Sequence, residues 1–321
     1  MAGEVSPPQP QPQSARRKPC FRDALIRRAF DRVAPRFADN DFLYREMARR
    51  MAERLEMVRL SPARILDLGC GLGADRLMLQ QCYPEATWVG VDASTALLHE
   101  GRLSEQAARS FMQRLLPSRR SSKNPRLAGR AVALPLTTQC VDLVWSNAML
   151  HWLDDLPAAL AEANRVLAIG GLFMFSLFGP DTLKELRQAL HAVSPGLADS
   201  MIAYTDMHDV GDMLVHAGFA DPVMDMEILT LTYEDPWRAL RELQGAGSVA
   251  AQMVENPFRG LRSRHFWWRV FEHWPRDAEG RYRLTFELIQ GHAWKVAPRQ
   301  HEDGRAVIQF MTRPGQVPRP P

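Results

Sequence analysis

The chain has 321 residues, of which 46% are apolar and 24% are charged, and its formal net charge is +3, values that fit a globular protein. Its four scattered cysteines exclude a disulfide framework and predict a reducing, cytoplasmic setting. The most apolar stretch, 166–179, is shorter than the roughly 20 residues that a membrane-spanning helix needs, so we expect no membrane partner.

The N-terminal part of the chain predicts a tail followed by two helices. Residues 1–20 are rich in Pro and Gln and are expected to be disordered, and 312–321 are expected to form a C-terminal tail. After residue 20, apolar residues recur at helical spacing as far as residue 60, with an interruption near Pro35. We expect two helices with a bend between them, at the start of a single domain over 21–311.

Short apolar runs separated by helix-like sequence predict the strands of a sheet. Four runs lie at 63–68, 88–92, 141–147 and 171–178, and a fifth follows at 284–294. Strands that alternate with helices are typical of a parallel sheet covered on both faces. We therefore predict an α/β fold with a doubly wound, mostly parallel sheet.

Two regions interrupt this alternation. Residues 101–130 are polar and basic, and they predict a flexible insertion between elements. Residues 181–283 read as helices mixed with loops. Within that region, 181–205 and 234–283 are expected to form a helical lid, which would exclude water from a reaction.

The most informative motif is the run Asp67-Leu68-Gly69-Cys70-Gly71-Leu72-Gly73, which directly follows the first strand. Closely spaced glycines let a backbone turn tightly and approach a ligand, because no Cβ stands in the way. The helix expected from about Ala74 directs its free amide groups toward that ligand. The run also satisfies the loose dinucleotide pattern G-x-G-x-x-G/A, so the glycines alone leave a nicotinamide cofactor open.

Residues at the strand ends separate the two kinds of ligand. Asp67 stands just before the glycines, where its charge repels a pyrophosphate but suits a cationic sulfonium ligand with an amino-acid tail. Asp92 ends the next strand, where a carboxylate accepts both hydroxyls of a ribose, a position that fits either ligand. The segment SNAMLHWLDD (146–155) follows a later strand, at the place expected for a third wall of the site. We therefore predict an S-adenosyl-L-methionine site, with a nicotinamide dehydrogenase as a distant alternative. Its expected residues are Asp67, Gly69, Cys70, Gly71, Gly73, Asp92, Ala93, Ser146 and Asn147.

These segments resemble the class I S-adenosylmethionine-dependent methyltransferases. ILDLGCGLG (65–73) is similar to the glycine motif of that class, GVD (90–92) to its ribose motif, and LPLTTQCVDLVWSNAMLHW (134–152) to its fourth strand and the following loop. The resemblance covers roughly residues 21–180. It implies a Rossmann-like sheet of seven strands that binds S-adenosyl-L-methionine.

Further segments resemble one family within this class, the malonyl-acyl-carrier-protein O-methyltransferases of biotin synthesis. They are IRRAFDRVAPRF (26–37), FGPDTLKELR (178–187), PWRALRELQGAG (236–247) and LTFELIQGHAWK (284–295). The resemblance implies methylation of the free carboxyl of a malonyl thioester, which is already ionised at neutral pH and needs no general base. Three alternatives share the fold: a protein arginine hydroxylase of complex I assembly, a small-molecule methyltransferase, and a cofactor-binding assembly factor without turnover.

The sequence departs from the family pattern at one cofactor position and leaves the substrate contacts open. Arg130 stands where members usually place an Asp that binds the adenine amino group, and an Arg offers no acceptor. Phe37 and His151 stand where relatives often have Tyr and Gln, and together with Arg187 they are candidate substrate residues. The cations that we consider for the substrate carboxylate are Arg36, Lys184, Arg187, Arg238 and Arg241.

Charge is unevenly distributed along the chain. Residues 101–130 contain eight Lys or Arg residues against Glu105 alone. Such a segment is either a solvated linker or a surface that steers an acidic acyl carrier protein toward the site. We expect malonyl-acyl carrier protein as the substrate partner of a monomer, no nucleic-acid partner, and no metal, because the histidines show no ligand-like spacing.

Overall fold

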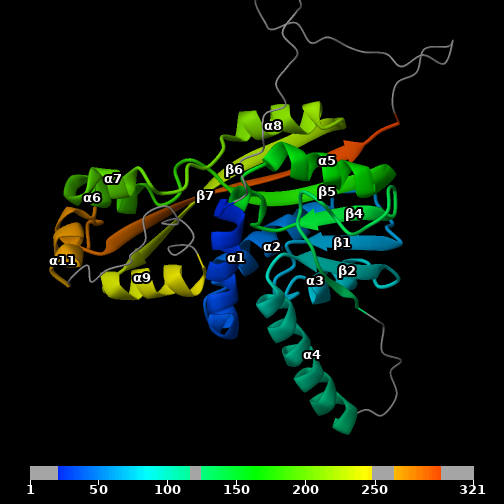
Figure 1. The fold of residues 1–321 in the computed structure, drawn as a ribbon, viewed down its shortest axis with the longest axis horizontal. Coiled ribbons are helices and arrows are strands. Elements are labelled where there is room, and N and C mark those ends of the chain that lie inside the picture. Colours follow the sequence, from blue (N-terminus) through cyan, green and yellow to red (C-terminus); the bar gives the residue numbers. More distant parts are fainter. Residues whose placement is uncertain (1–20, 116–123, 248–263, 298–321) are drawn as a thin grey trace, which may run out of the picture.

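The computed structural model describes residues 21–115, 124–247 and 264–297. Its strands form one seven-stranded sheet in the order β3-β2-β1-β4-β5-β7-β6 (Figure 1). The strands are β1 (Arg64–Leu68), β2 (Thr87–Asp92), β3 (Arg126–Ala128), β4 (Val141–Ser146), β5 (Leu167–Phe178), β6 (Phe219–Tyr233) and β7 (Tyr282–Lys295). The first five strands are parallel to one another, and β7 runs antiparallel between β5 and β6. The prediction of a mostly parallel, seven-stranded sheet is confirmed.

Helices precede the sheet, cover both of its faces and gather beyond one end of it. In the N-terminal half they are α1 (Phe21–Val33), α2 (Phe42–Leu55), α3 (Arg76–Cys82), α4 (Thr95–Leu115) and α5 (Leu156–Val166), with 3-10 turns η1 (Ala34–Asp39) and η2 (Leu150–Trp152). The others are α6 (Lys184–Val193), α7 (Pro195–Ala198), α8 (Met207–His216), α9 (Pro236–Gly245) and α11 (Arg264–His273). The predicted tails, 1–20 and 312–321, lie outside the described residues.

Successive residues of β4 show how the central strands are buried on both faces. Leu143 and Trp145 pack in a core cluster with α2 and α3, whereas Val144 packs with α5 and α8 on the other face. All three side chains are inaccessible to solvent. A strand buried on both faces reads as a continuous apolar run, which is why the sequence predicts this strand clearly.

The predicted pair of N-terminal helices with a bend is confirmed. Pro35 lies in the first turn of η1, where its missing N–H breaks no helical hydrogen bond, and η1 separates α1 from α2. In Figure 1, α1 stands across the middle of the molecule, between the parallel strands and the helices beyond the sheet. This position brings the N-terminal helices to the carboxyl ends of the strands.

The prediction of a flexible insertion over 101–130 is wrong at both ends. Residues 101–115 continue helix α4, and Arg126–Ala128 form strand β3, in which Arg126 lies opposite Gly90 of β2. The charges in this segment are partly paired rather than solvated, because Glu105 on α4 lies 3.1 Å from Arg76 and 3.4 Å from Arg126. Residues 116–123, at the centre of the predicted insertion, lie outside the described residues.

Strand β6 was not predicted, because the region 181–283 was interpreted as helices and loops. β6 is the edge strand of the sheet and pairs with β7 alone, with Met226 opposite Ile289. Leu229 and Leu231 are half-buried between exposed threonines. This alternation with a period of two residues was the available signal, but it is weak because no β6 side chain except Phe219 is fully buried.

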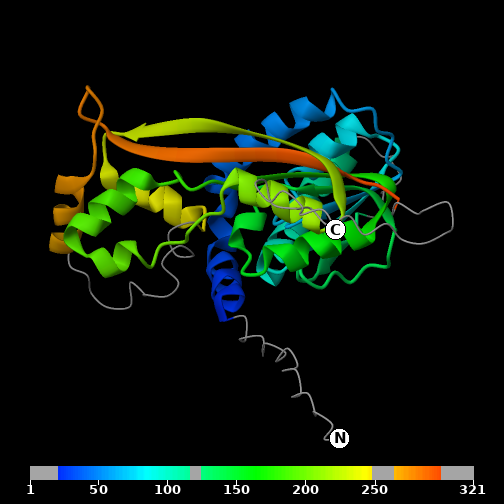
Figure 2. The same ribbon diagram turned by 90° about the horizontal axis from the view of Figure 1, so that it is seen from above.

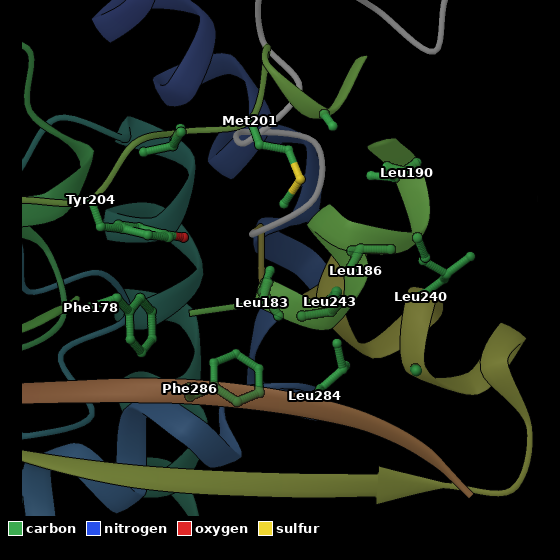
Figure 3. Packing of buried hydrophobic residues seen from close by; sticks show 14 of the residues in the cluster. Phe178, Leu183, Leu186, Leu190, Met201, Tyr204, Leu240, Leu243, Leu284 and Phe286 are labelled. Carbon is green, nitrogen blue, oxygen red and sulfur yellow. The ribbon is translucent and has the colours of Figure 1, made fainter. Parts of the chain in front are cut away.

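Strands β6 and β7 are much longer than the central strands and extend past the end of β5 (Figure 2). Their far ends carry α6, α7, α9 and α11, which share one apolar cluster with the end of β5. Figure 3 shows side chains from these elements pointing toward one another, among them Phe178, Leu243 and Phe286. The segments 181–205 and 234–283 thus contribute to one helical body, and its function as a lid stays a prediction.

Candidate active site

A cavity of about 580 Å³ lies where β1, β2 and β4 end. One wall consists of the loops that follow these strands, and the opposite wall consists of α1, η1 and the start of α2. Because parallel strands all end at the same edge of a sheet, residues from distant parts of the chain meet at this edge. The predicted residues Asp67, Gly69, Cys70, Gly71, Asp92, Ala93 and Asn147 line the cavity together with Phe37.

The glycine loop has a backbone that only glycine adopts without strain. Gly69 has a φ of 79°, and a Cβ at this position would lie 2.3 Å from Cγ of Met149. Gly73 has a φ of 75°, but it faces away from the cavity, because its Cβ would meet the Arg126 guanidinium at 2.6 Å. Gly69 and Gly71 line the cavity, whereas Gly73 does not, and Gly69 and Gly73 make room for the side chains of Met149 and Arg126.

Asp92 is held in place by backbone N–H groups. Its Oδ2 accepts a hydrogen bond from the Gly71 N–H at 2.8 Å, and its Oδ1 accepts one from the Ser94 N–H at 2.7 Å. Burial raises the pKa of Asp92, and these two hydrogen bonds counteract the effect. A carboxylate oxygen has a second lone pair, so both oxygens remain able to accept the two hydroxyls of a vicinal diol.

Three carboxyl groups, of which Asp67 and Asp41 are buried and Asp75 is partly buried, lie at one end of the cavity. Asp67 accepts a hydrogen bond from Trp88 Nε1 at 3.3 Å, and Asp75 accepts one from Trp145 Nε1 at 2.9 Å. Burial raises the pKa of Asp67 well above its usual value, with Asp75 adding to the effect, and burial raises the pKa of Asp75 to about 6. Asp41 also lines this region. Such crowded carboxyl groups favour a cationic ligand.

Aromatic rings cover the wall opposite the glycine loop. The ring of Phe37 lies 5.2 Å from that of Tyr44 and 6.1 Å from that of Phe30, and Phe30 lies 5.5 Å from Trp152. All four residues line the cavity. The aromatic part of this wall is therefore apolar, and it comes from the N-terminal helices and from η2.

Ser146 and Asn147 were predicted together, but the structure gives them different surroundings. Ser146 is fully buried, does not line the cavity, and donates a hydrogen bond to the Leu68 carbonyl at 3.1 Å, which joins the ends of β4 and β1. Asn147 lines the cavity, donates from Nδ2 to the Tyr44 carbonyl at 2.9 Å, and accepts from Ser176 Oγ at 2.8 Å. Asn147 thus ties α2 to the sheet at the cavity wall.

Two of the three candidate substrate residues lie away from the cavity. His151 is buried among the rings of Trp152, Phe178 and Tyr204, and its Nδ1 accepts a hydrogen bond from the Phe178 N–H at 3.3 Å. Burial lowers the pKa of His151 to about 3, so the ring is neutral at physiological pH. Arg187 lies on α6 and donates to a backbone carbonyl at 3.0 Å. Of the three, Phe37 alone is in contact with the cavity.

Comparisons with known proteins agree with this geometry. A methyltransferase-domain family matches residues 66–175. The malonyl-[acyl-carrier protein] O-methyltransferase of Gallionella capsiferriformans is 41% identical over 285 residues, which cover 88% of this chain and 94% of that protein. The protein of the same name from Nitrosospira multiformis is 40% identical over 278 residues, covering 85% of this chain and 89% of that protein. This chain belongs to the malonyl-[acyl-carrier protein] O-methyltransferase family.

Solved structures share the fold at much lower identity. The YcgJ protein of Bacillus subtilis superposes with a TM-score of 0.54 at 15% identity, covering 77% of this chain and 98% of that chain. A putative methyltransferase from Bacillus halodurans gives a TM-score of 0.51 at 16% identity, covering 77% of this chain and 99% of that chain. This O-methyltransferase family member thus has the same fold as both of these structures.

Arg130, the residue that departs from the pattern of this O-methyltransferase family, lies at the cavity wall. Its Nη2 is 2.8 Å from Oδ2 of Asp23 on α1, and both residues line the cavity. The ion pair joins the loop after β3 to the N-terminal helix. Arg130 therefore has a structural partner on the opposite wall, which sequence reasoning did not foresee.

Sequence reasoning also missed cavity residues that only the tertiary structure brings in. These are Asp23, Arg27, Phe30, Asp41, Tyr44, Arg45 and Asp75. Asp75 could have been predicted, since it is an acidic residue two positions after Gly73. The segment 26–37 resembles the family, but no spacing in the sequence places α1 and α2 opposite the strand ends.

Within the described residues, 21–115, 124–247 and 264–297, no group of three or more His, Cys, Asp or Glu residues is arranged to hold a metal ion. None of the helices in these described ranges combines the length and the apolar character that crossing a bilayer requires.

The neutral state of His151 predicts a pH dependence of stability. Because burial lowers its pKa from 6.5 to about 3, the unfolded chain binds more protons than the folded chain between these values. The free energy of unfolding therefore falls as the pH falls below 6.5, by up to about 1.4 kcal/mol per pH unit from this residue. Between pH 7 and pH 5, we expect the free energy of unfolding of His151→Gln to fall by about 2 kcal/mol less than that of the wild type. Urea titrations at both pH values measure this difference, and parallel losses in the two proteins would contradict it.

Proposed function

We propose that the chain transfers a methyl group from S-adenosyl-L-methionine to the free carboxyl of malonyl-acyl carrier protein, in the biotin pathway. The observation that carries this proposal is the cavity at the strand ends, with its glycine loop and its buried carboxyl groups. The chain is also 41% identical to a protein named malonyl-[acyl-carrier protein] O-methyltransferase. The relatives are matched over most of their length, so the proposal concerns the whole reaction and not only a shared cofactor domain.

The cavity residues fit the proposed cofactor. Gly71 lines the cavity and has only Leu97, at 3.9 Å, near its Cβ position, so a ligand can approach the backbone there, and Asp92 has lone pairs for the ribose hydroxyls. Asp67 and Asp75 supply negative charge for the ammonium group of the amino-acid tail. When bound, S-adenosyl-L-methionine supplies a methyl group on a positively charged sulfur.

The chain has little acid–base chemistry to perform on the proposed acceptor. A malonyl carboxylate is ionised at neutral pH, so no side chain has to remove a proton. His151, which is buried away from the cavity, is consequently not required as a base. The task left to the protein is to strip water from the carboxylate and hold it about 3–3.5 Å from the methyl carbon. The rings of Phe30, Phe37 and Trp152 provide a dry wall for this purpose.

Arg27 is the cation that we propose for binding the acceptor carboxylate. It lies on α1, lines the cavity, and has no ion-pair partner within the described part of the chain, whereas Arg45 and Arg130 pair with Asp41 and Asp23. The five cations considered from the sequence do not line the cavity. Among them, Lys184, Arg238 and Arg241 form ion pairs elsewhere.

We expect Arg27→Gln to raise KM for malonyl-acyl carrier protein about tenfold, because one charge-assisted hydrogen bond at a partly exposed site is worth about 1.4 kcal/mol. The dissociation constant for the cofactor stays unchanged. Arg28→Gln is the matched control, since Arg28 is the neighbouring exposed residue of α1 and does not line the cavity. Equal KM values for the two variants would exclude Arg27 from acceptor binding.

The proposed reaction is tested with purified protein, methyl-labelled S-adenosyl-L-methionine and malonyl-acyl carrier protein. We expect a base-labile labelled ester on the carrier-bound acyl group, and no label on acetyl-acyl carrier protein, which has no free carboxyl. Binding of S-adenosyl-L-homocysteine without ester formation would contradict the proposed reaction and favour an assembly factor without turnover.

A further inference from the structure

Arg126 carries a buried positive charge that the proposed chemistry does not use. Its side chain is 3% exposed, and its Nε and Nη1 have no hydrogen-bond acceptor among the residues that the structure describes. Nη2 lies 3.4 Å from Glu105, which also lies 3.1 Å from Arg76 and is therefore shared by two guanidinium groups. Burying a guanidinium with so few acceptors costs free energy, and we therefore expect this charge to have a function.

The guanidinium of Arg126 lies directly behind the glycine loop. A Cβ on Gly73 would lie 2.6 Å from Nη2, and a Cβ on Gly101 of α4 would lie 2.9 Å from Nη1. The side chain is thus confined between the loop and α4, on the side of the loop that does not face the cavity. Gly73 is therefore required by this side chain and not by a ligand, whereas Gly101 also makes room for the Leu72 carbonyl, whose oxygen would lie 2.3 Å from a Cβ.

A chain of contacts leads from Arg126 to Asp67 across three neighbouring strands. The guanidinium carbon of Arg126 on β3 lies 5.7 Å from the ring centroid of Trp88 on β2, within the range of a cation–π interaction. Trp88 in turn donates from Nε1 to Oδ2 of Asp67 on β1 at 3.3 Å. The positive charge therefore lies behind the indole whose N–H binds the carboxylate.

The groups that face Asp67 are otherwise acidic or neutral. Burial raises the pKa of Asp67 most and Asp75 and Asp92 add to it, whereas the Trp88 hydrogen bond and, more weakly, the Arg126 charge lower it. Cys70 is buried beside Asp67, and its pKa is raised by burial and by Asp67, so this thiol is neutral. Among the described groups that act on Asp67, Arg126 supplies the positive charge.

We propose that Arg126 is a positioning residue for cofactor binding, which stabilises the anionic form of Asp67 from behind the glycine loop and keeps that carboxylate ready for the ammonium group of the cofactor. This inference rests on the proposed function. It assigns a role in ligand binding to a residue that does not touch the ligand and that lies in a segment predicted to be a flexible insertion.

Calorimetric titration of S-adenosyl-L-homocysteine between pH 5 and pH 8.5 tests the proposal. In the wild type, we expect affinity to rise with pH to a plateau as Asp67 ionises. In Arg126→Met, the midpoint of this rise moves up by about one pH unit, so binding is about tenfold weaker on the acidic side and nearly normal at pH 8.5. Arg126→Lys keeps the charge, and its midpoint remains near that of the wild type.

Arg102→Met is the matched control, because Arg102 is an exposed neighbour that donates to the Arg126 carbonyl at 2.6 Å, and its midpoint should not move. Circular dichroism checks that each variant is folded. Equal weakening by Arg126→Met at every pH, or an equal shift in Arg126→Lys, would overturn this inference alone. If the wild type binds no S-adenosyl-L-homocysteine at any pH, both the proposed function and this inference are contradicted.

Discussion

Replacing Asp92 by alanine is expected to weaken the binding of S-adenosyl-L-homocysteine about 100-fold. Two hydrogen bonds from ribose hydroxyls to a carboxylate contribute about 1.5 kcal/mol each, and about 3 kcal/mol corresponds to this factor. The substitution also leaves the Gly71 and Ser94 N–H groups without their acceptor, which loosens the glycine loop. Isothermal titration measures the loss directly, and the variant should fail to restore growth of a biotin-requiring strain that the wild type rescues.

Asp142→Ala is a matched control for Asp92→Ala. Asp142 also accepts two backbone hydrogen bonds through its carboxylate, from the Ala63 and Arg64 N–H groups at 3.0 and 2.9 Å, but it does not line the cavity. We expect this control to lower stability without changing affinity. If Asp92→Ala binds the ligand as tightly as Asp142→Ala does, Asp92 is not the ribose-binding residue.

Replacing Gly69 by alanine is expected to destabilise the protein by about 2–4 kcal/mol and to weaken ligand binding at least about tenfold. The new methyl group would stand 2.3 Å from Cγ and 2.6 Å from Cβ of Met149, so Met149 or the loop itself has to shift. The φ of 79° adds strain for any residue with a side chain. Urea denaturation measures the first effect, and calorimetric titration measures the second.

Two further variants separate the clash at Gly69 from the backbone strain. Gly170 has a φ of 80°, and nothing lies within 4 Å of its Cβ position, so Gly170→Ala should cost about 1 kcal/mol and leave binding intact. Met149→Ala in the Gly69→Ala background removes the clash and should restore part of the lost stability. If Gly170→Ala and Gly69→Ala are equally destabilised, the contact with Met149 is not what excludes a side chain at Gly69.

The parts of the fold that the sequence predicted are those in which the local pattern and the burial agree. β1, β2, β4 and β5 lie inside the sheet and read as apolar runs, and β7 is buried along nearly its whole length. β6 was missed because an edge strand with exposed Val223, Met226 and Ile228 does not show a clean apolar pattern. The continuation of α4 was missed because its charges, such as Glu105, indicated solvent although they pair with neighbouring elements.

The candidate site also has residues that the sequence predicted and residues that it did not predict. The glycine loop and Asp92 were predictable, because a strand end followed by glycines is a local feature with a local physical reason. The wall formed by Phe30 and Tyr44 was not, because contacts between the N-terminal helices and the strand ends depend on tertiary packing. Ser146 shows the opposite error, since its place at a strand end indicated a ligand, whereas its hydroxyl is used to join two strands.

The place of β7 between β5 and β6 has a consequence for synthesis of the chain. β5 ends at Phe178, and the strand that covers its edge, with Leu288 opposite Phe178, is among the last described residues. At 5–20 residues per second, a nascent chain exposes the edge of β5 for on the order of ten seconds after the first five strands have left the ribosome. An open edge of this kind is a template for pairing with other chains. Synthesis of β7, rather than formation of the glycine loop, is therefore the step that completes the sheet.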